Sequence, residues 1–484
     1  MRTVGWVMRI MRHAVLVGAL VSVVGCGTEP FVLLPDEATQ AVDESQYELL
    51  ARFAHISDAH IIDEESPGRL TVFARLVSTA WRPQEAYSLQ LLDGMIRTVN
   101  KIHVAQTPID FLIHTGDATD NAQINEYQWF VTVMDGGTVN PLTGPDDRDA
   151  IEVPDPTLDP HHSFVAQGLY RHGVHGRDAT IPWYTIAGNH DLFAEGVFPI
   201  VTNIYGDRTS PLPLSNRIGL FAPVILNPTG GLAWGAITPA HPGPPPEVVL
   251  PEAIEPNPDR RFATAREFVE VHAASVTEPV GHGFDPTSPG ALWYSVSPKP
   301  GLRLIGLNTS DPFLQIPTEV YSEGAISFAQ IEFLKAELEA AQKRGDVVIV
   351  ATHHPSDAIA IGNGSSVSPK SFRDILNGFP CVALHIAGHW HTNLAIDRGG
   401  YVELITGAII DAPQTGRIVS IWKKRDTNSA VSPATVELRY RSFSHLDTIE
   451  PPDDRDAALF DDPLRGMREV AFRLATGGLQ PVTK

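Results

Sequence analysis

Cysteine is scarce in this sequence, which has only Cys26 and Cys381 among 484 residues. Cys26 closes an export-like leader, so Cys381 has no partner and a disulfide framework is excluded. Cys381 opens an apolar run and is predicted to be a buried structural thiol. Beyond the N-terminal leader the sequence also has no run of eighteen apolar residues, which excludes a transmembrane helix from the rest of the chain.

Positive charge is the second shortage. The chain has 36 Lys and Arg against 57 Asp and Glu, a formal net charge of −21. A nucleic-acid partner would need a clustered basic face to neutralise phosphates, so none is expected. A small phosphorylated substrate is compatible with this balance if the site itself is locally positive. A hydrophobic fraction of 43% is ordinary for a globular protein with a large core.

The N-terminus has the pattern of an export signal. Three arginines precede an apolar stretch from Ala14 to Gly25, which has signal-peptide length. The stretch ends in Val-Val-Gly-Cys26, which is similar to a bacterial lipobox, where the cysteine is acylated. The alternative is an ordinary signal peptide with a chance cysteine. We therefore expect residues 1–25 to be a lipoprotein signal peptide, and residues 26–50 to tether an exported domain to a bacterial membrane through lipid on Cys26.

Strands and helices alternate along the next four hundred residues. Apolar residues spaced three and four apart predict an amphipathic helix over 85–102. Ser327 with Gln330, and Gly345, mark the two ends of a second helix. Apolar runs predict strands that end near 56 and over 111–113, 182–187, 302–307, 347–351, 381–387, 401–405, 417–422 and 435–439. This alternation is typical of an α/β fold.

Two stretches interrupt the alternation. Residues 135–180 and 206–260 are rich in Gly and Pro, and are predicted to be long loop insertions at the rim of a site. The candidate ligands described next extend from residue 58 to residue 391, so one domain over 51–450 must contain both insertions. Residues 451–484 are assigned to a C-terminal tail.

Five short segments carry metal-ligand side chains where an apolar run stops. They are His55-Ile-Ser-Asp58-Ala-His60, Gly116-Asp117-Ala-Thr-Asp120-Asn121, Gly188-Asn189-His190-Asp191, His353-His354-Pro355 and Gly388-His389-Trp-His391. In open α/β sheets, ligands bind outside the carboxyl ends of the strands. Several of these segments follow predicted strands, so we expect them to meet at one edge.

This set of donors suits a pair of metal ions. Two metals about 3.5–4 Å apart can hold the attacking and leaving oxygens of a displacement at phosphorus. Asp117 suits a bridging position because a carboxylate has two oxygens. Asp58 and His60 suit one metal, and His389 and His391 have the same spacing. Mixed His, Asp and Asn ligands are compatible with Mn, Fe or Zn.

The five segments together resemble the calcineurin-like metallophosphoesterase superfamily, in its phosphodiesterase-like branch. The resemblance implies a four-layer α/β/β/α sandwich. It also implies that Asp117 bridges two metals. One metal would be held by Asp58, His60, Asp117 and His391; the other would be held by Asp117, Asn189, His353 and His389. His190, oriented by Asp120, would assist the leaving group as a hydroxide bridging the metals attacks phosphorus.

We therefore predict a metal-dependent phosphodiesterase or phosphomonoesterase that acts on small phosphate esters outside the cytoplasm. Asn121 stands where protein phosphatases of the superfamily carry an arginine, which disfavours phosphoprotein substrates. The alternative is a surface binding protein that keeps the fold without efficient catalysis. Its membrane contact would be through the lipid alone, and no oligomeric state is predicted.

Overall fold

The computed structural model describes most of the chain beyond the leader. It covers residues 32–66, 82–144, 156–170, 181–202, 257–311, 322–360, 365–425, 431–452 and 457–476, with four short strands between 208 and 254. The signal peptide and the lipid anchor on Cys26 lie outside the described residues and stay predictions. In the described part, no helix is both long and apolar enough to cross a bilayer.

A five-stranded sheet forms the first half of the fold, in the order β19-β18-β2-β3-β6. Strands β2, β3 and β6 are parallel neighbours, whereas β18 pairs antiparallel with both β2 and β19. Its strands are β2 (Tyr47–Ile56), β3 (Phe111–His114), β6 (Trp183–Thr185), β18 (Thr415–Lys424) and β19 (Val436–Ser444). Because β2, β3 and β6 run in the same direction, their carboxyl ends share one edge.

A seven-stranded sheet forms the second half, in the order β1-β16-β17-β15-β14-β13-β12. Strands β13, β14, β15 and β17 are parallel, while the outer strands are antiparallel. Its strands are β1 (Val32–Leu33), β12 (Tyr294–Lys299), β13 (Leu302–Gly306), β14 (Val347–Ala351), β15 (Val382–Ala387), β16 (Leu394–Asp397) and β17 (Val402–Ile405). The central strands β14 and β15 are buried along their whole length, as expected for a sheet covered on both faces.

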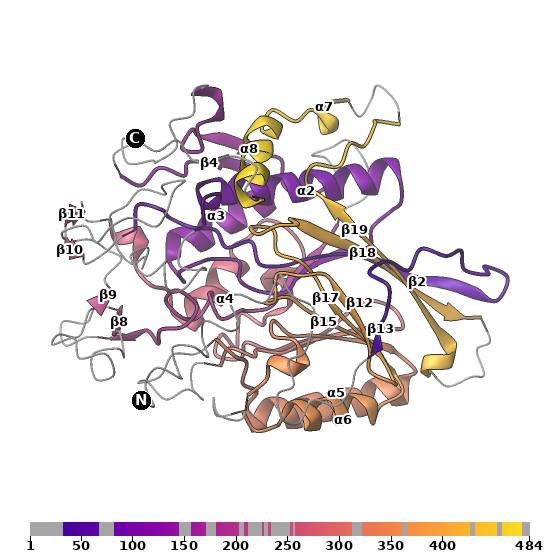
Figure 1. Cartoon of the computed structure of the whole chain (residues 1–484). Helices are drawn as coiled ribbons and strands as arrows, with labels where there is room; N and C mark the ends of the chain where they lie inside the picture. The colour runs from indigo at the N-terminus through magenta and orange to yellow at the C-terminus, as the bar shows by residue number, and fades with distance from the viewer. Residues whose placement is uncertain are drawn as a thin grey trace, which may run out of the picture.

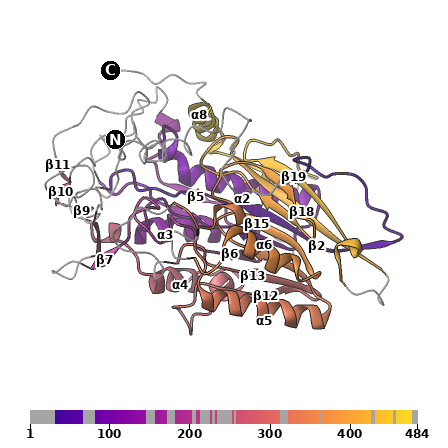
Figure 2. The same ribbon diagram turned by 60° about the horizontal axis from the view of Figure 1, so that its bottom comes forward.

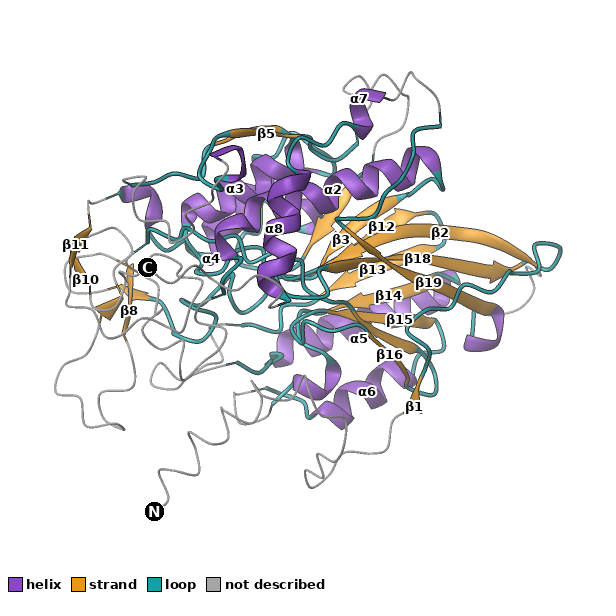
Figure 3. Cartoon of the chain, turned by 45° about the horizontal axis from the view of Figure 1, so that its top comes forward, coloured by secondary structure: helices purple, strands orange, loops and turns teal. Residues whose placement is uncertain are grey.

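The two sheets pack face to face between two layers of helices (Figures 1 and 3). Alternate residues of one strand point to opposite faces. Phe53 and Phe111 accordingly join the core shared with the seven-stranded sheet, whereas Ala54 and Leu112 join the core under the helices. The helices on the five-stranded side include α2 (Ser88–Ala105), α3 (Ile124–Asp135), α4 (Ala265–Ala273), α7 (Ala457–Phe460) and α8 (Arg465–Ala475). Those on the other side are α5 (Phe328–Arg344) and α6 (Pro369–Asn377). The predicted four-layer α/β/β/α sandwich is confirmed.

The predicted elements match closely in position. The helix expected over 85–102 is α2, preceded by one turn of 3-10 helix. Helix α5 begins after Ser327, whose side chain accepts a hydrogen bond from the Gln330 amide, and it ends at Gly345 with φ of 75°. Glycine adopts this left-handed conformation at little cost. Cys381 is buried as a free thiol, as predicted.

Two predicted segments contain secondary structure that was not expected. Residues 26–50 were expected to form a tether, but β1 pairs with β16, Ala38 bridges to Tyr440, and β2 already begins at Tyr47. The tail over 451–484 contains α7 and α8, which pack on α2. Neither stretch has a long apolar run that would have indicated its structure. Each is held by short strand pairings or by a single helix face.

Both insertions contact the loop that follows His60. In the first insertion, β4 (Gly137–Val139) pairs with β5 (Phe164–Ala166), and Thr143 Oγ1 donates to Asp63 Oδ1 at 2.8 Å. At the end of the second insertion, Arg260 is buried with its Nε 3.2 Å from Asp63 Oδ2. The second insertion includes the short strands β8 (Arg208–Pro211), β9 (Ile225–Leu226), β10 (Gly231–Ala233) and β11 (Glu252–Ile254), and β7 (Val201–Thr202) precedes it (Figure 2). Through these contacts, described residues of both insertions lie beside Asp63, three residues after His60.

Buried histidines outside the site predict a loss of stability in acid. Burial lowers the pKa of His272 to about 4, and the pKa values of His282 and His445 to about 3. In the unfolded chain these side chains take up protons near pH 6.5. The free energy of unfolding is therefore highest above pH 6.5, and should fall between about pH 6.5 and 4 by roughly 3 kcal/mol per histidine.

Chemical denaturation at a series of pH values measures this fall. His282→Phe should reduce its slope, because phenylalanine keeps a ring stacked on Trp183 without a titrating group. His162→Gln is the matched control, because the side chain of His162 is 57% exposed. An unchanged slope in His282→Phe would contradict the assignment.

Candidate metal centre

The predicted ligands follow strands of both sheets and converge on one site. In the five-stranded sheet, Asp58 and His60 follow β2, Asp117 follows β3 and Asn189 follows β6. In the seven-stranded sheet, His353 follows β14, and His389 and His391 follow β15. The carboxyl ends of these parallel strands meet at one edge, so the structure brings all seven side chains together. All but His389 and His391 are buried.

The backbone at the ligands is unusual. Asp58, His60, Asp117, His389 and His391 all have positive φ, between 44° and 66°. Asp and His adopt this left-handed conformation more readily than most residues, yet it remains uncommon and costs on the order of 1 kcal/mol or more each. Five such residues in one site indicate that the surrounding fold enforces these turns so that the side chains point inward.

Two motif glycines are required by close approach. A Cβ built on Gly188 would overlap Oδ1 of Asp117, and one built on Gly388 would overlap Oδ2 of Asp58. Each glycine therefore makes room for a carboxylate from another segment. This packing explains why glycine precedes Asn189 and His389 in the sequence.

One group of donors surrounds Asp58. His391 Nε2 lies 3.2 Å from Asp58 Oδ1 and 3.2 Å from His60 Nε2. His60 Nε2 lies 3.8 Å from Asp58 Oδ1 and 3.7 Å from Asp117 Oδ2. Donor atoms of Asp58, His60 and His391 all lie within 4.8 Å of one another. This is the set predicted for one metal, with Asp117 at its edge.

A second group surrounds His353. Its Nε2 lies 3.0 Å from Asp117 Oδ2, and its Nδ1 donates to the carbonyl of Thr115 at 2.8 Å. Donor atoms of His353, His354 and His389 lie within 4.8 Å of one another. Asp117 contacts both groups, as a bridging ligand would. His354 was not among the expected ligands. It lies beside this second group, and its Nδ1 is held by Thr309 Oγ1 at 2.7 Å.

Asn189 has a side-chain oxygen, Oδ1, that is buried without a partner among the described residues. Its Nδ2 donates to the carbonyl of Gly196 at 3.0 Å, which fixes the orientation of the amide. A buried oxygen without a partner is costly unless it meets a cation or water. Gly196 was missed by the sequence reasoning, because its role depends on a contact across a loop.

Charges at the site are arranged as a cation would require. Burial opposes ionisation of Asp117, but His353 and His190 outweigh it and hold the pKa of that carboxyl below its usual range. Burial likewise disfavours the charged imidazoles, yet Asp117 raises the pKa of His353 to about 9, and Asp58 raises the pKa of His391 to about 10. The positive charges of protonated His353 and His391 balance the negative charges of the carboxylates. Metal ions would replace these protons, so metal affinity should rise with pH.

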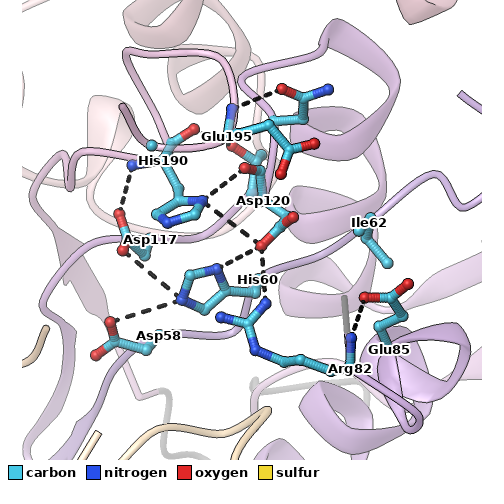
Figure 4. Close-up of polar contacts among 12 residues, drawn as sticks. Asp58, His60, Ile62, Arg82, Glu85, Asp117, Asp120, His190 and Glu195 are labelled. Atoms are coloured by element: carbon cyan, nitrogen blue, oxygen red, sulfur yellow. Dashed lines mark hydrogen bonds and ion pairs between the residues drawn. The ribbon is translucent and has the colours of Figure 1, made fainter. Parts of the chain in front are cut away.

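An outer layer of charged groups holds the first group of ligands (Figure 4). His60 Nδ1 is 2.8 Å from Asp120 Oδ1, and His391 Nδ1 is 2.7 Å from Asp411 Oδ2. Arg82 lies between these two carboxylates, 3.2 Å from Asp120 and 3.1 Å from Asp411. Arg82 and Asp411 were missed by the sequence reasoning. Asp411 follows a strand and could have been noticed, but nothing near Arg82 resembles a motif.

His190 contacts Asp120 mainly through the backbone of that residue. Its Nδ1 donates to the backbone carbonyl of Asp120 at 2.7 Å, while the Asp120 carboxylate lies 3.5 Å away and is 2.8 Å from His60. Asp120 therefore orients His190 mainly through its backbone, and its side chain holds His60. Burial lowers the pKa of His190 to about 4, so this imidazole is neutral near pH 7.

The donor set fits a pair of metal ions. Imidazole nitrogens combined with carboxylate and amide oxygens suit Mn, Fe and Zn. Carboxylates or carbonyls hold the distal nitrogens of His60, His353 and His391, as is usual for metal-ligating histidines. The unpartnered oxygen of Asn189 completes this pattern.

Comparison with known proteins supports this assignment. Residues 51–243 match the family of calcineurin-like phosphoesterases, whereas no curated protein matches the sequence. Solved structures with some similarity include a dimetal phosphatase from Danio rerio (13% identity, 81% of this chain, 99% of that chain, TM-score 0.35). Another is a putative 5'-nucleotidase from Staphylococcus aureus (13% identity, 86% and 58%, TM-score 0.33). With TM-scores below 0.5, these two carry no weight in the argument. The family match spans Asp58, Asp117 and Asn189, so residues 51–243 of the chain are similar to calcineurin-like phosphoesterases.

Proposed function

We propose that the protein hydrolyses phosphate esters with the help of two metal ions held by the seven predicted ligands. The observation that carries this proposal is the convergence of donors from two sheets around Asp117, with Asn189 Oδ1 buried and unpartnered. Such a site needs a cation, and the family match makes phosphate esters the expected substrates. When bound, a metal pair supplies Lewis-acid activation of the phosphoryl group and of water.

The protein groups would hold and orient the reactants. Asp117 is held by its own neighbours: its Oδ1 accepts a hydrogen bond from the His190 amide at 2.8 Å, which leaves Oδ2 toward His60 and His353. A carboxylate fixed in this way keeps the two groups of donors at a constant separation. Positioning of this kind contributes much of the catalysis in phosphoryl transfer.

His190 is the proposed proton-handling residue. Because its Nδ1–H is committed to the Asp120 carbonyl, the neutral ring has only Nε2 to offer to a reactant. In this state Nε2 accepts a proton or a hydrogen bond. To assist the leaving group, the ring must first gain a proton, which a nearby phosphate anion would favour. The side chain is 10% exposed, so a substrate at the site can reach it.

The surroundings favour small esters over phosphoproteins. Asn121 occupies the position of the missing arginine, and its Oδ1 accepts a hydrogen bond from the Glu195 amide at 2.8 Å. The side chain is fully buried and supports the loop that carries Gly196, so it does not bind phosphate. We extend the proposal to phosphodiesters and phosphomonoesters without choosing between them.

A metal-dependent assay tests the proposal. Purified protein is stripped with a chelator and supplied with Mn²⁺, Fe²⁺ or Zn²⁺. It is then assayed on bis-p-nitrophenyl phosphate and p-nitrophenyl phosphate by release of nitrophenolate. We expect no turnover by the stripped protein, and recovery with at least one of the three metals. Recovery should require about two ions per chain, measured by elemental analysis.

Two outcomes would contradict the proposal. Turnover that survives complete removal of metal would mean that another site performs the reaction. Two bound ions without turnover of either ester, or of any member of a panel of monoesters, diesters and cyclic nucleotides, would favour the non-catalytic binding protein instead.

A further inference from the structure

Arg82 is a buried arginine at the edge of the candidate metal centre, only 4% exposed. It lies three residues before the 3-10 turn that leads into α2. Figure 4 shows its guanidinium beside His60, below Asp120. No proposed step in catalysis uses this residue, so its burial next to the ligands requires an explanation.

The guanidinium joins two carboxylates from loops that lie far apart in the sequence. Its Nη1 lies 3.2 Å from Asp120 Oδ1, which follows β3, and its Nε lies 3.1 Å from Asp411 Oδ2, which follows β17. Burial disfavours the charged form, but Asp411 and Asp120 outweigh it and keep the pKa of Arg82 above its ordinary value. Without this charge, the buried carboxylate of Asp120 and the partly exposed one of Asp411 would lose the guanidinium that lies between them.

Each of these carboxylates holds one imidazole. Asp120 Oδ1 is 2.8 Å from His60 Nδ1, and Asp411 Oδ2 is 2.7 Å from His391 Nδ1. A carboxylate accepts, so each Nδ1 must donate, and each Nε2 is left to bind a cation. The two Nε2 atoms lie 3.2 Å apart and face the same oxygen of Asp58. A continuous chain of contacts thus connects His60, through Arg82, to His391.

The surrounding loop is built to hold Arg82 in place. The backbone amide of Arg82 donates to Glu85 Oε2 at 2.9 Å. Gln84 Nε2 lies 3.2 Å from the carbonyl of Ile410 and 2.9 Å from Asp411 Oδ1. Two neighbouring residues therefore bind Asp411 from the same loop. Such a fixed arrangement differs from that of a charged side chain that happens to fold against the surface.

We propose that Arg82 is a positioning residue that aligns His60 and His391 as a pair for one of the two metal ions. The inference rests on the proposed function, because it requires a metal at this site. Arg82 acts only through Asp120 and Asp411, and it would not touch substrate. Among the described residues, the hydrogen bonds and ion pairs of the Arg82 guanidinium go to Asp120 and Asp411 and not to the His353 group, so the second ion should be unaffected.

Titration of metal-free protein with Mn²⁺ in a calorimeter tests this role. Wild-type protein should bind two ions. In Arg82→Met, one binding event should weaken about 10- to 100-fold, as is typical when a group behind a metal ligand is lost. The other event should keep its affinity. Arg82→Lys should behave like Arg82→Met, because an ammonium cannot span two carboxylates as the planar guanidinium does.

Controls separate this effect from general damage. Arg468→Met removes another buried guanidinium, in α8, and should leave both binding events intact. If Arg82→Met does not fold, Asp411→Asn is tested in its place. Asp411 holds His391 and its side chain is partly exposed, so this substitution should weaken one binding event in the same way. Two wild-type affinities in Arg82→Met, or in Asp411→Asn, would overturn the inference. Fewer than two ions bound by wild-type protein would instead refute the proposed function.

Discussion

Asp117→Asn is expected to reduce phosphate-ester hydrolysis by roughly 10³-fold or more, since the metal pair contributes several kcal/mol and about 1.4 kcal/mol equals one factor of ten. Asp117 is the carboxylate that contacts both groups of donors, 3.7 Å from His60 and 3.0 Å from His353. Asparagine has nearly the same shape, but it lacks the charge and can present only one oxygen to cations. Binding of the metal pair should weaken together with turnover.

The measurement combines steady-state kinetics with metal analysis at fixed Mn²⁺. Asp135→Asn is the matched control, because Asp135 is a buried aspartate whose oxygens accept hydrogen bonds from Ser275 and Thr277. It should lose stability but keep both ions and its turnover. Wild-type turnover by Asp117→Asn would rule out the bridging role, and with it the assignment of the site.

His190→Gln is expected to lower kcat by about 10²- to 10⁴-fold, the usual contribution of a positioned acid or base. The side chain of His190 lies next to the ligands without being assigned to a metal, so the variant should keep two ions. The His190 amide, which donates to Asp117, is unchanged by the substitution. Turnover should therefore fall while metal content and folding remain.

Comparison of two leaving groups refines this test. If His190 assists departure, the loss should be largest for an alkyl ester, whose alkoxide needs a proton, and smaller for p-nitrophenyl esters. His162→Gln, at an exposed histidine, should leave both rates unchanged. Loss of one metal in His190→Gln would reassign this residue to the ligand set, and an unchanged kcat would remove it from the mechanism.

Much of the fold was predictable because polar ligands interrupt apolar strands abruptly. Asp58 follows the buried end of β2, and His353 follows β14, whose five residues are all buried. Apolar runs then identified the strands, and apolar residues spaced three and four apart identified a helix. The site could be assembled from sequence because parallel strands place their carboxyl ends at one edge.

What escaped prediction depends on contacts between distant segments. Arg82 and Asp411 are 329 residues apart, and neither belongs to a repeated pattern. The pairing of β1 with β16 involves only Val32 and Leu33, which is too short to be recognised as a strand. Helix α8 was more accessible, since Met467, Ala471 and Leu474 lie on one face. Its burial nevertheless depends on α2, almost four hundred residues earlier.

The origin of the ligands has a mechanical consequence. Asp58 and His60 belong to one β layer while His391 belongs to the other; Asn189 is likewise opposite His353 and His389. Each metal ion would thus link the two β layers at the edge where their parallel strands end. Removal of the ions should leave the hydrophobic core intact but release the contact between the two layers at that edge. Loss of metal would then destabilise the protein at this edge and also abolish its activity.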